Sequence, residues 1–208
     1  MRIKNLKTYK KVLFVIDMVN GFVYDGALKD AEIANTIPRQ IELIKEYQKE
    51  RQLVIFIKDV HEPNSVEHKR FNGLTHCLRG TNEVELVPEL KPYEDADNVL
   101  VLEKNSTSLF TNPDIFSQIE LLENVEEVDI VGCCTDICVL NAVLPLMNYY
   151  DQINKNVVVR VHEDAIETYD APWHSREVYS EAAYMLMEQQ GAVKVRKYGE
   201  MKYGKKAQ

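Results

Sequence analysis

Short runs of apolar residues recur along the chain, each about as long as a buried strand. They are rich in valine and isoleucine and do not alternate with polar residues, a pattern typical of parallel strands covered on both faces. We predict five such strands and a sixth, shorter one near the end of the chain, at residues 12–17, 53–58, 98–103, 128–133, 156–161 and 192–196.

Segments with helical periodicity separate these runs. Two of them open with a proline in the first turn, and a third contains an internal proline that should bend it. The four predicted helices cover residues 36–47, 112–122, 138–150 and 174–190. Alternating strands and helices predict an α/β fold, a doubly wound, mostly parallel six-stranded sheet with helices on both faces.

Residues 60–92 interrupt this alternation. The segment has no clear periodicity and is long for a loop in a compact domain, so we predict a functional role for it. It contains three of the five histidines of the chain. Because no repeat, linker or low-complexity stretch divides the sequence, we expect one domain over residues 1–208.

Charge and composition indicate which classes of partner and which cellular compartment to expect. The formal net charge of -8 argues against a nucleic-acid backbone as partner. No apolar run approaches the roughly 20 residues needed to cross a bilayer, and the N-terminal segment does not read as a signal peptide. We therefore expect a cytoplasmic protein without a membrane partner. Three of the four cysteines lie within six residues, so we expect no disulfides.

Polar residues follow several predicted strands at their carboxyl ends, where ligands bind in open α/β sheets. Asp17 ends the first strand, Lys104 follows the third, and Cys138 lies in the turn after the fourth. A helix start and a nearby lysine both lower the pKa of a thiol, so we expect thiolate near neutral pH. A carboxylate such as Asp17 could exchange a proton with the thiol and a departing amine, and N–H groups of the turn could stabilise an oxyanion.

Spacing alone leaves simpler interpretations open. A cysteine after an apolar strand is commonly a small buried side chain, and this is how we interpret Cys133 and Cys134. Asp17 would equally serve as a turn or cap residue, and Lys104 as a surface charge.

A second set of candidates follows the second strand. Asp59 and His61 stand two residues apart, and Glu67, His68 and His76 follow in the long segment. Carboxylate and imidazole ligands together suit Zn, Mn or Fe, with waters completing the coordination shell. Such residues in a surface loop are also commonly just solvated, so spacing alone does not decide between the two.

Three parts of the sequence together resemble the isochorismatase-like cysteine hydrolase family. They are VLFVIDMVNGF at residues 12–22, Lys104 with the Ser106 and Phe110 that follow it, and GCCTDICV at residues 132–139. Their order and spacing agree with the family over nearly the whole chain. The family forms homo-oligomers, which implies a dimer or larger assembly here.

The resemblance implies a catalytic site at these motifs. Asp17, Lys104 and Cys138 match the family's catalytic triad. The family has a cis peptide in the turn after the fourth strand, which by position joins Cys133 to Cys134. The same resemblance implies that the N–H groups of Cys134 and Cys138 are the oxyanion donors.

Within the family, the resemblance narrows to the nicotinamidase branch. That branch binds a metal ion through an Asp-x-His pair, a Glu or His from the following loop, and a second His just before a Cys. The implied ligands are Asp59, His61, Glu67 and His76, with His68 as the alternative to Glu67 and Zn as the expected metal (Mn or Fe as alternatives).

The substrate that the branch implies is a small amide, with nicotinamide hydrolysed to nicotinate and ammonia while the metal ion binds the ring nitrogen. Phe22 would pack against the substrate ring, with Phe71 and Leu74 as weaker candidates. Residues 71–75, FNGLT, stand where nicotinamidases usually have an aromatic residue and two prolines, so the substrate stays open. The alternatives are a metal-independent hydrolase of ureido, carbamoyl or other small amides, and a non-catalytic binding protein that retains the fold.

Overall fold

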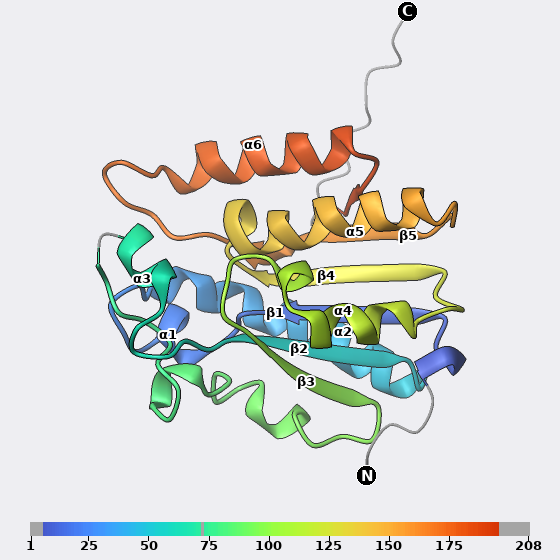
Figure 1. Ribbon diagram of the computed structural model, residues 1–208, viewed down its shortest axis with the longest axis horizontal. Helices are drawn as coiled ribbons and strands as arrows, with labels where there is room; N and C mark the ends of the chain where they lie inside the picture. The colour runs from blue at the N-terminus through green and yellow to red at the C-terminus, as the bar shows by residue number, and fades with distance from the viewer. Residues whose placement is uncertain (1–5, 72, 196–208) are drawn as a thin grey trace, which may run out of the picture.

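The computed structural model describes residues 6–71 and 73–195. Six strands form one sheet in the order β3-β2-β1-β4-β5-β6, and every neighbouring pair is parallel (Figure 1). The strands are β1 (Lys11–Ile16), β2 (Leu53–Asp59), β3 (Val99–Lys104), β4 (Glu127–Cys133), β5 (Val158–Glu167) and β6 (Val193–Val195). The predicted six-stranded parallel α/β sheet is confirmed.

In the described parts of the chain, four longer helices pack on the sheet, and shorter helical turns connect the elements. The longer helices are α2 (Ile37–Lys49), α4 (Pro113–Glu120), α5 (Leu140–Gln152) and α6 (Arg176–Gln189). The short α-helices are α1 (Asn20–Val23) and α3 (Val66–Arg70). The remaining turns are the 3-10 helices η1 (Leu6–Thr8), η2 (Ala31–Thr36), η3 (Asn82–Val84), η4 (Lys91–Tyr93) and η5 (Leu109–Thr111), and the π-helical turn η6 (Thr135–Val139). None of the helices in the described ranges is long and apolar enough to span a bilayer.

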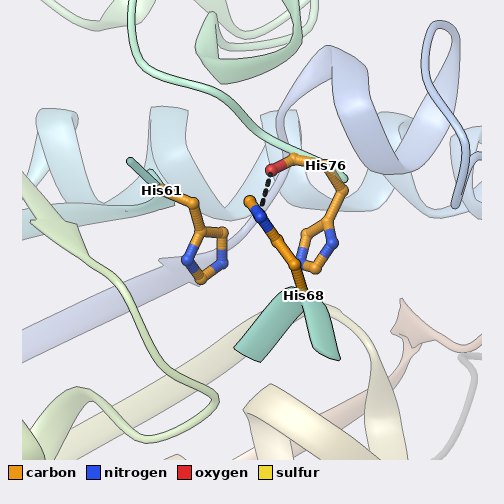
Figure 2. Close-up of side chains that lie close together, drawn as sticks. All are labelled: His61, His68 and His76. Atoms are coloured by element: carbon orange, nitrogen blue, oxygen red, sulfur yellow. Dashed lines mark hydrogen bonds between the residues drawn. The ribbon is translucent and has the colours of Figure 1, made fainter. Parts of the chain in front are cut away.

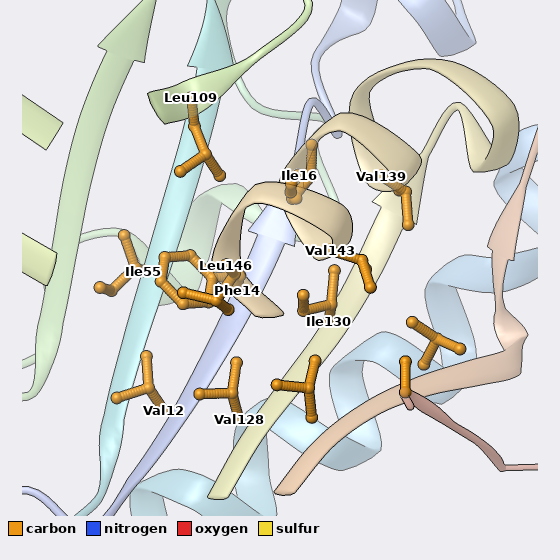
Figure 3. Packing of buried hydrophobic residues seen from close by; sticks show 14 of the residues in the cluster. Val12, Phe14, Ile16, Ile55, Leu109, Val128, Ile130, Val139, Val143 and Leu146 are labelled. Atoms are coloured by element: carbon orange, nitrogen blue, oxygen red, sulfur yellow. The ribbon is translucent and has the colours of Figure 1, made fainter. Parts of the chain in front are cut away.

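Two hydrophobic layers enclose the sheet because side chains alternate along each strand. Figure 3 shows one layer, in which Val12, Phe14 and Ile16 of β1 lie beside Val143 and Leu146 of α5. Helices α4 and α6 add buried side chains to the same layer. Both faces of β1 are therefore buried, which explains its continuous run of apolar residues.

The second layer lies on the opposite face of the sheet. Leu13 and Val15 of β1 pack there against Leu43 and Ile44 of α2. Side chains from the segment between β2 and β3, among them Leu86, complete this layer. The predicted helices on both faces are thus present.

The fifth predicted strand is too short at its carboxyl end. Strand β5 continues to Glu167, because Ala165 and Ile166 are buried beyond the polar residues 162–164 that interrupt its apolar run. The last strand covers only Val193–Val195, and the Arg196 included in its prediction lies outside the described residues.

The long segment after β2 returns to the carboxyl ends of two strands. Its described residues form α3, η3 and η4 and no strand of the sheet. His61 forms a parallel bridge with Leu78, and Val19 forms an antiparallel bridge with Leu86. These bridges hold the segment over the sheet edge at which ligands bind in such folds.

The end of strand β4 requires glycine. Gly132, the second-last residue of the strand, has a φ of 120°, and a Cβ atom there would lie 2.0 Å from the backbone oxygen of Ile16. The peptide bond between Cys133 and Cys134 is cis, as predicted. The Cys133 thiol donates to the backbone oxygen of Asp17 at 3.2 Å, so this turn lies directly beside the end of β1.

Candidate active site and metal cluster

Three sequence-predicted catalytic residues meet at the carboxyl edge of the sheet. Lys104 Nζ lies 2.8 Å from Asp17 Oδ2 and 3.6 Å from Cys138 Sγ. All three residues are buried. They come from the end of β1, the end of β3 and the turn η6, so residues distant in sequence form one compact group.

The strands themselves fix the first two side chains. Asp17 adopts a positive φ of 53°, a conformation that aspartate tolerates better than most residues. Its N–H donates to the oxygen of Ile57 at 2.8 Å, which holds the turn after β1 against β2. Lys104 is the register partner of Asp59 across β2 and β3, so both side chains lie at the same level of the sheet.

Cys138 does not occupy the first turn of a regular α-helix. It lies in the π-helical turn η6, and α5 begins two residues later at Leu140. The predicted helix over residues 138–150 therefore starts later than expected. Turns of this kind are frequent at functional sites.

Burial dominates the electrostatics of the group. It raises the pKa of the Cys138 thiol well above its usual value, and the opposing effect of Lys104 does not compensate. The thiolate that we expected near neutral pH is thus disfavoured, because Asp17 and Asp59 also raise this pKa. Cys138 needs a base to remove its proton.

Asp17 has the properties of such a base. Burial raises its pKa to about 6, the positive Lys104 opposes the shift, and negative Asp59 adds to it. Within the described part of the chain, no aligned hydrogen bond satisfies either of its carboxylate oxygens. Burial would lower the pKa of Lys104, but Asp17 and Asp59 outweigh that effect and raise it, so the lysine stays charged.

Asp59 connects this group to a second cluster. Its Oδ1 lies 3.0 Å from Lys104 Nζ, and its Oδ2 lies 2.8 Å from His61 Nε2. Burial alone would raise the pKa of Asp59, but Lys104 and His61 together lower it. Asp59 is therefore ionised and faces both groups at once.

The second cluster contains every residue that the sequence predicts as a metal ligand. One set of four possible ligand atoms, all within 4.8 Å of one another, comes from Asp59, His61, Glu67 and His76. A second set within the same limit consists of His61, His68 and His76. Figure 2 shows these three imidazoles close together. Their ring centroids are 4.8 to 5.0 Å apart, and each pair is arranged edge to face.

Hydrogen bonds orient the three rings, and the Nε2 atoms of His61 and His76 lie 2.8 Å and 3.7 Å from Asp59 Oδ2. His61 Nδ1 lies 3.1 Å from Ser65 Oγ, and His76 Nδ1 donates to the oxygen of Leu74 at 3.0 Å. His68 Nε2 donates to the oxygen of His76 at 3.2 Å (Figure 2). Its buried Nδ1 has no hydrogen-bond partner in the described residues. Such anchoring of the outer nitrogen is typical of metal-binding histidines, so the donor set fits a divalent cation.

Both candidates for the remaining ligand lie at the cluster. Glu67 Oε1 is 3.8 Å from His61 Nε2, and burial followed by negative Asp59 raises the pKa of Glu67. His68, its neighbour on α3, is buried. The sequence favours Glu67, and the structure brings both residues close enough to serve.

A cavity of about 350 Å³ opens beside Cys138 and the metal cluster. The three predicted substrate contacts, Phe22, Phe71 and Leu74, line it. Cys134 packs against the second hydrophobic layer, but it is only half-buried and also lines the cavity, so the expected full burial is wrong for this residue. Its backbone N–H forms no hydrogen bond within the described residues.

Sequence reasoning missed one wall of this cavity. This wall consists of residues between β5 and α6, namely Tyr169, Asp170, Ala171 and Trp173. The Trp173 side chain is 75% exposed. The one local signal was an aromatic pair in an otherwise polar loop, which does not by itself indicate a binding site.

The fold and site define an isochorismatase-family hydrolase. The model of the isochorismatase domain matches residues 11–194, so this chain belongs to the isochorismatase family. It is 30% identical over 174 residues to the isochorismatase family protein PncA of Bacillus subtilis, covering 80% of this chain and 91% of the relative. It is 27% identical over 176 residues to nicotinamidase 1 of Arabidopsis thaliana, covering 78% of this chain and 71% of the relative.

The fold is also similar to that of solved structures. The pyrazinamidase of Pyrococcus horikoshii in complex with zinc has a TM-score of 0.72 and 24% identity to this chain. The comparison covers 90% of this chain and 99% of the other.

Proposed function

We propose that the protein hydrolyses a small amide with Cys138 as nucleophile. The observation that carries this proposal is the buried contact of Lys104 Nζ with both Asp17 Oδ2, at 2.8 Å, and Cys138 Sγ, at 3.6 Å. A buried base, a cation and a thiol in contact are costly to maintain for stability alone. Placed beside a cavity, they are the groups that covalent acyl transfer requires.

The reaction begins with proton transfer from the thiol. Asp17 takes the proton of Cys138 as the sulfur attacks the amide carbon, and the N–H groups of Cys134 and Cys138 hold the resulting oxyanion. The C–N bond then breaks, and Asp17 returns the proton to the departing ammonia. Water attacks the thioester carbon as Asp17 accepts its proton. The C–S bond then breaks, the acid is released, and Asp17 returns the proton to the sulfur.

Lys104 stabilises the negative charges during these steps. Its ammonium group lies between two carboxylates and beside the sulfur, so it favours the thiolate at the moment of attack. Because its pKa is raised, it remains a cation while Asp17 changes its charge.

We further propose that nicotinamide is the substrate and that Asp59, His61, His76 and Glu67 hold a divalent cation, with His68 as the alternative to Glu67. Such a cation would supply a Lewis-acid contact for the ring nitrogen. Phe22, Phe71 and Leu74 would enclose the ring in the cavity. The 27% identity to a nicotinamidase supports this choice of substrate.

Ammonia release from nicotinamide tests the proposal. Purified protein should release ammonia, a chelator should abolish the release, and added Zn should restore it. The Cys138→Ala variant should be inactive, while Cys77→Ala, which changes a buried cysteine outside the cavity lining, should retain activity. Unchanged ammonia release by Cys138→Ala would remove the nucleophile from the proposal.

A metal-independent hydrolase of ureido or carbamoyl compounds is the second candidate. The observation in its favour is the segment at residues 71–75, which lacks the prolines usual in nicotinamidases and contributes Phe71 and Leu74 to the cavity. Hydrolysis of N-carbamoyl substrates that persists after chelation, without activity on nicotinamide, would select this alternative. Elemental analysis of the protein as purified provides an independent check.

A further inference from the structure

His174 forms an aromatic stack beside the nucleophile turn, which is η6 (Thr135–Val139) with Cys138. The stack includes Tyr169, which lines the cavity. The ring of His174 is stacked on Tyr169, with centroids 3.9 Å apart and planes at 11°, and on Tyr179, at 3.8 Å and 25°. His174 is buried and immediately precedes Ser175, the N-cap of α6. The imidazole is therefore fixed on both faces.

Both nitrogens of this ring are engaged as well. Nδ1 lies 3.0 Å from the backbone oxygen of Tyr169, and Nε2 lies 2.9 Å from Asp136 Oδ2. Backbone N–H to oxygen bonds of 2.9 Å join His174 and Ala171 in both directions. The ring and backbone of His174 thus hold the segment from Tyr169 to His174 in one conformation.

Asp136 connects His174 to the nucleophile turn. It lies in η6, two residues before Cys138. Its Oδ1 accepts a hydrogen bond from Thr168 Oγ1 at 2.6 Å, while its Oδ2 contacts His174. One carboxylate thus joins η6 to two points of the segment that follows β5, and no step of the proposed reaction uses it.

We propose that His174 is a positioning residue. Through Asp136 it fixes the backbone of η6, and with it the direction of the Cys138 sulfur and of the Cys138 N–H group. Through Tyr169 it fixes the cavity wall. Its effect on turnover rests on the proposed hydrolase function, whereas its effect on the reactivity of the Cys138 thiol does not.

Two variants separate the contacts of His174. His174→Phe keeps an aromatic ring for the stack and removes both ring nitrogens, whereas His174→Gln restores a donor that can reach Asp136. Asp136→Asn keeps the side-chain shape and serves where His174→Phe does not fold. The matched control is His162→Phe, because His162 is likewise buried and bonded to a carboxylate, Asp129, at 2.6 Å, but that carboxylate lies in β4 and not in η6.

The first readout is the rate at which iodoacetamide alkylates Cys138, assigned by peptide mass spectrometry. We expect His174→Phe and Asp136→Asn to slow alkylation at least fivefold, His174→Gln to recover part of the rate, and His162→Phe to react like the unaltered protein. Wild-type rates in both His174→Phe and Asp136→Asn, or an equal loss in His162→Phe, would overturn the proposal.

The second readout is steady-state hydrolysis of nicotinamide. Misplacement of a reacting atom by about 1 Å costs roughly 10²-fold in rate, so we expect kcat of His174→Phe to fall by 10- to 100-fold and KM to change less than about threefold. A loss confined to KM would contradict positioning of the nucleophile. If the unaltered protein has no activity on nicotinamide, the hydrolase proposal fails, and the alkylation rates still decide the role of His174.

Discussion

Two aspartates at the ends of neighbouring strands have opposite electrostatic properties. Both are buried and both contact Lys104, yet the pKa of Asp17 is raised to about 6 while that of Asp59 is lowered. The difference arises because Asp59 also accepts a hydrogen bond from His61. Because of these different surroundings, Asp17 can gain and lose a proton near neutral pH, whereas Asp59 stays negatively charged.

The raised pKa of Asp17 predicts a pH dependence. Above about pH 6 its carboxylate is ionised and can accept the thiol proton, whereas below about pH 6 it is protonated. We expect kcat/KM to fall about tenfold per pH unit on the acid side. A cation bound at Asp59 would move this limb to lower pH.

Activity profiles between pH 4 and 8 check this expectation. Asp17→Asn should lower kcat/KM by roughly 10²–10⁴-fold and abolish the acid limb in the residual activity. Glu89→Gln, which alters an exposed residue outside the cavity lining, is the control. An acid limb that persists unchanged in Asp17→Asn would assign it to another group.

The metal cluster predicts a change in thermal stability. A cation at 100 times its dissociation constant adds about 2.7 kcal/mol to the free energy of unfolding, which corresponds to a Tm increase of roughly 5–10 °C for a chain of this size. We expect added Zn to produce such an increase after chelation. His76→Asn should lose it, and Glu62→Gln, an exposed neighbour of His61, should retain it.

Scanning calorimetry with and without Zn measures this effect. Equal Tm increases in His76→Asn and the unaltered protein would place the cation elsewhere. Comparing the Tm increase with Zn in Glu67→Gln and in His68→Asn then identifies the remaining ligand. The variant that lacks the true ligand should show the smaller increase, because it binds the cation more weakly.

Residue identities at this site follow from sequence motifs, whereas residue properties depend on burial. The motifs alone identify Asp17, Lys104 and Cys138, and these three residues do meet in the structure. The sequence predicts a lowered pKa for the Cys138 thiol, and this direction is wrong. Burial raises the pKa, and the extent of burial is known only from the folded structure. Tyr169 and Trp173 carry no motif, and only the path of the chain after β5 brings them to the cavity.

At the scale of elements, the turn after β4 depends on close contact between two strands. Gly132 is the register partner of Ile16, and the β4–β5 register shifts between Ile130 and Gly132. A side chain at Gly132 would overlap the backbone of Ile16, which cannot move without displacing β1. The nucleophile turn therefore starts from a fixed point of the sheet.

Gly132→Ala should therefore destabilise the protein strongly. We expect a loss of more than about 3 kcal/mol in the free energy of unfolding, from backbone strain together with the clash. Gly80→Ala is the matched control, because Gly80 also has a positive φ, of 81°, but has open space around its Cα. It should lose only about 1–2 kcal/mol.

Urea denaturation followed by circular dichroism measures both variants. Similar losses for Gly132→Ala and Gly80→Ala would show that the positive φ, rather than the contact with Ile16, sets the requirement for glycine.

Element types were predictable and some element ends were not. Buried parallel strands leave uninterrupted apolar runs, so β1 to β4 were located within a residue or two. The sequence predicts too early an end for β5, because His162, Glu163 and Asp164 interrupt its apolar run. The strand continues to Glu167. Polar residues that find partners in the fold do not end a strand, and the sequence does not show those partners.

Across the whole protein, a buried hydrogen-bond network of His162, Asp129 and Tyr47 joins the sheet to α2. His162 Nε2 lies 2.6 Å from Asp129 Oδ1, and the hydroxyl of Tyr47 donates to the other oxygen of Asp129. Burial would raise the pKa of Asp129, but the hydrogen bonds from His162 and Tyr47 lower it. This network ties α2, β4 and β5 together away from the cavity.

The network predicts how global stability depends on pH. The pKa of Asp129 lies below its ordinary value of 3.8 in the folded state, so its contribution is complete above pH 3.8 and is lost as pH falls through the folded pKa. Asp129→Asn should lower the free energy of unfolding by about 2–4 kcal/mol near neutral pH, because it leaves His162 without its charged partner. The difference from the unaltered protein should shrink below about pH 3.8.

Urea titrations at a series of pH values measure this difference, with the exposed Asp95→Asn as control. A deficit in Asp129→Asn that stays constant down to pH 2 would mean that shape, rather than charge, explains the loss. Because Asp129 lies on the far side of β4 from α5 and outside the cavity lining, kcat/KM should be unaffected at neutral pH while the variant remains folded. Stability and catalysis would then depend on separate buried carboxylates of the same sheet.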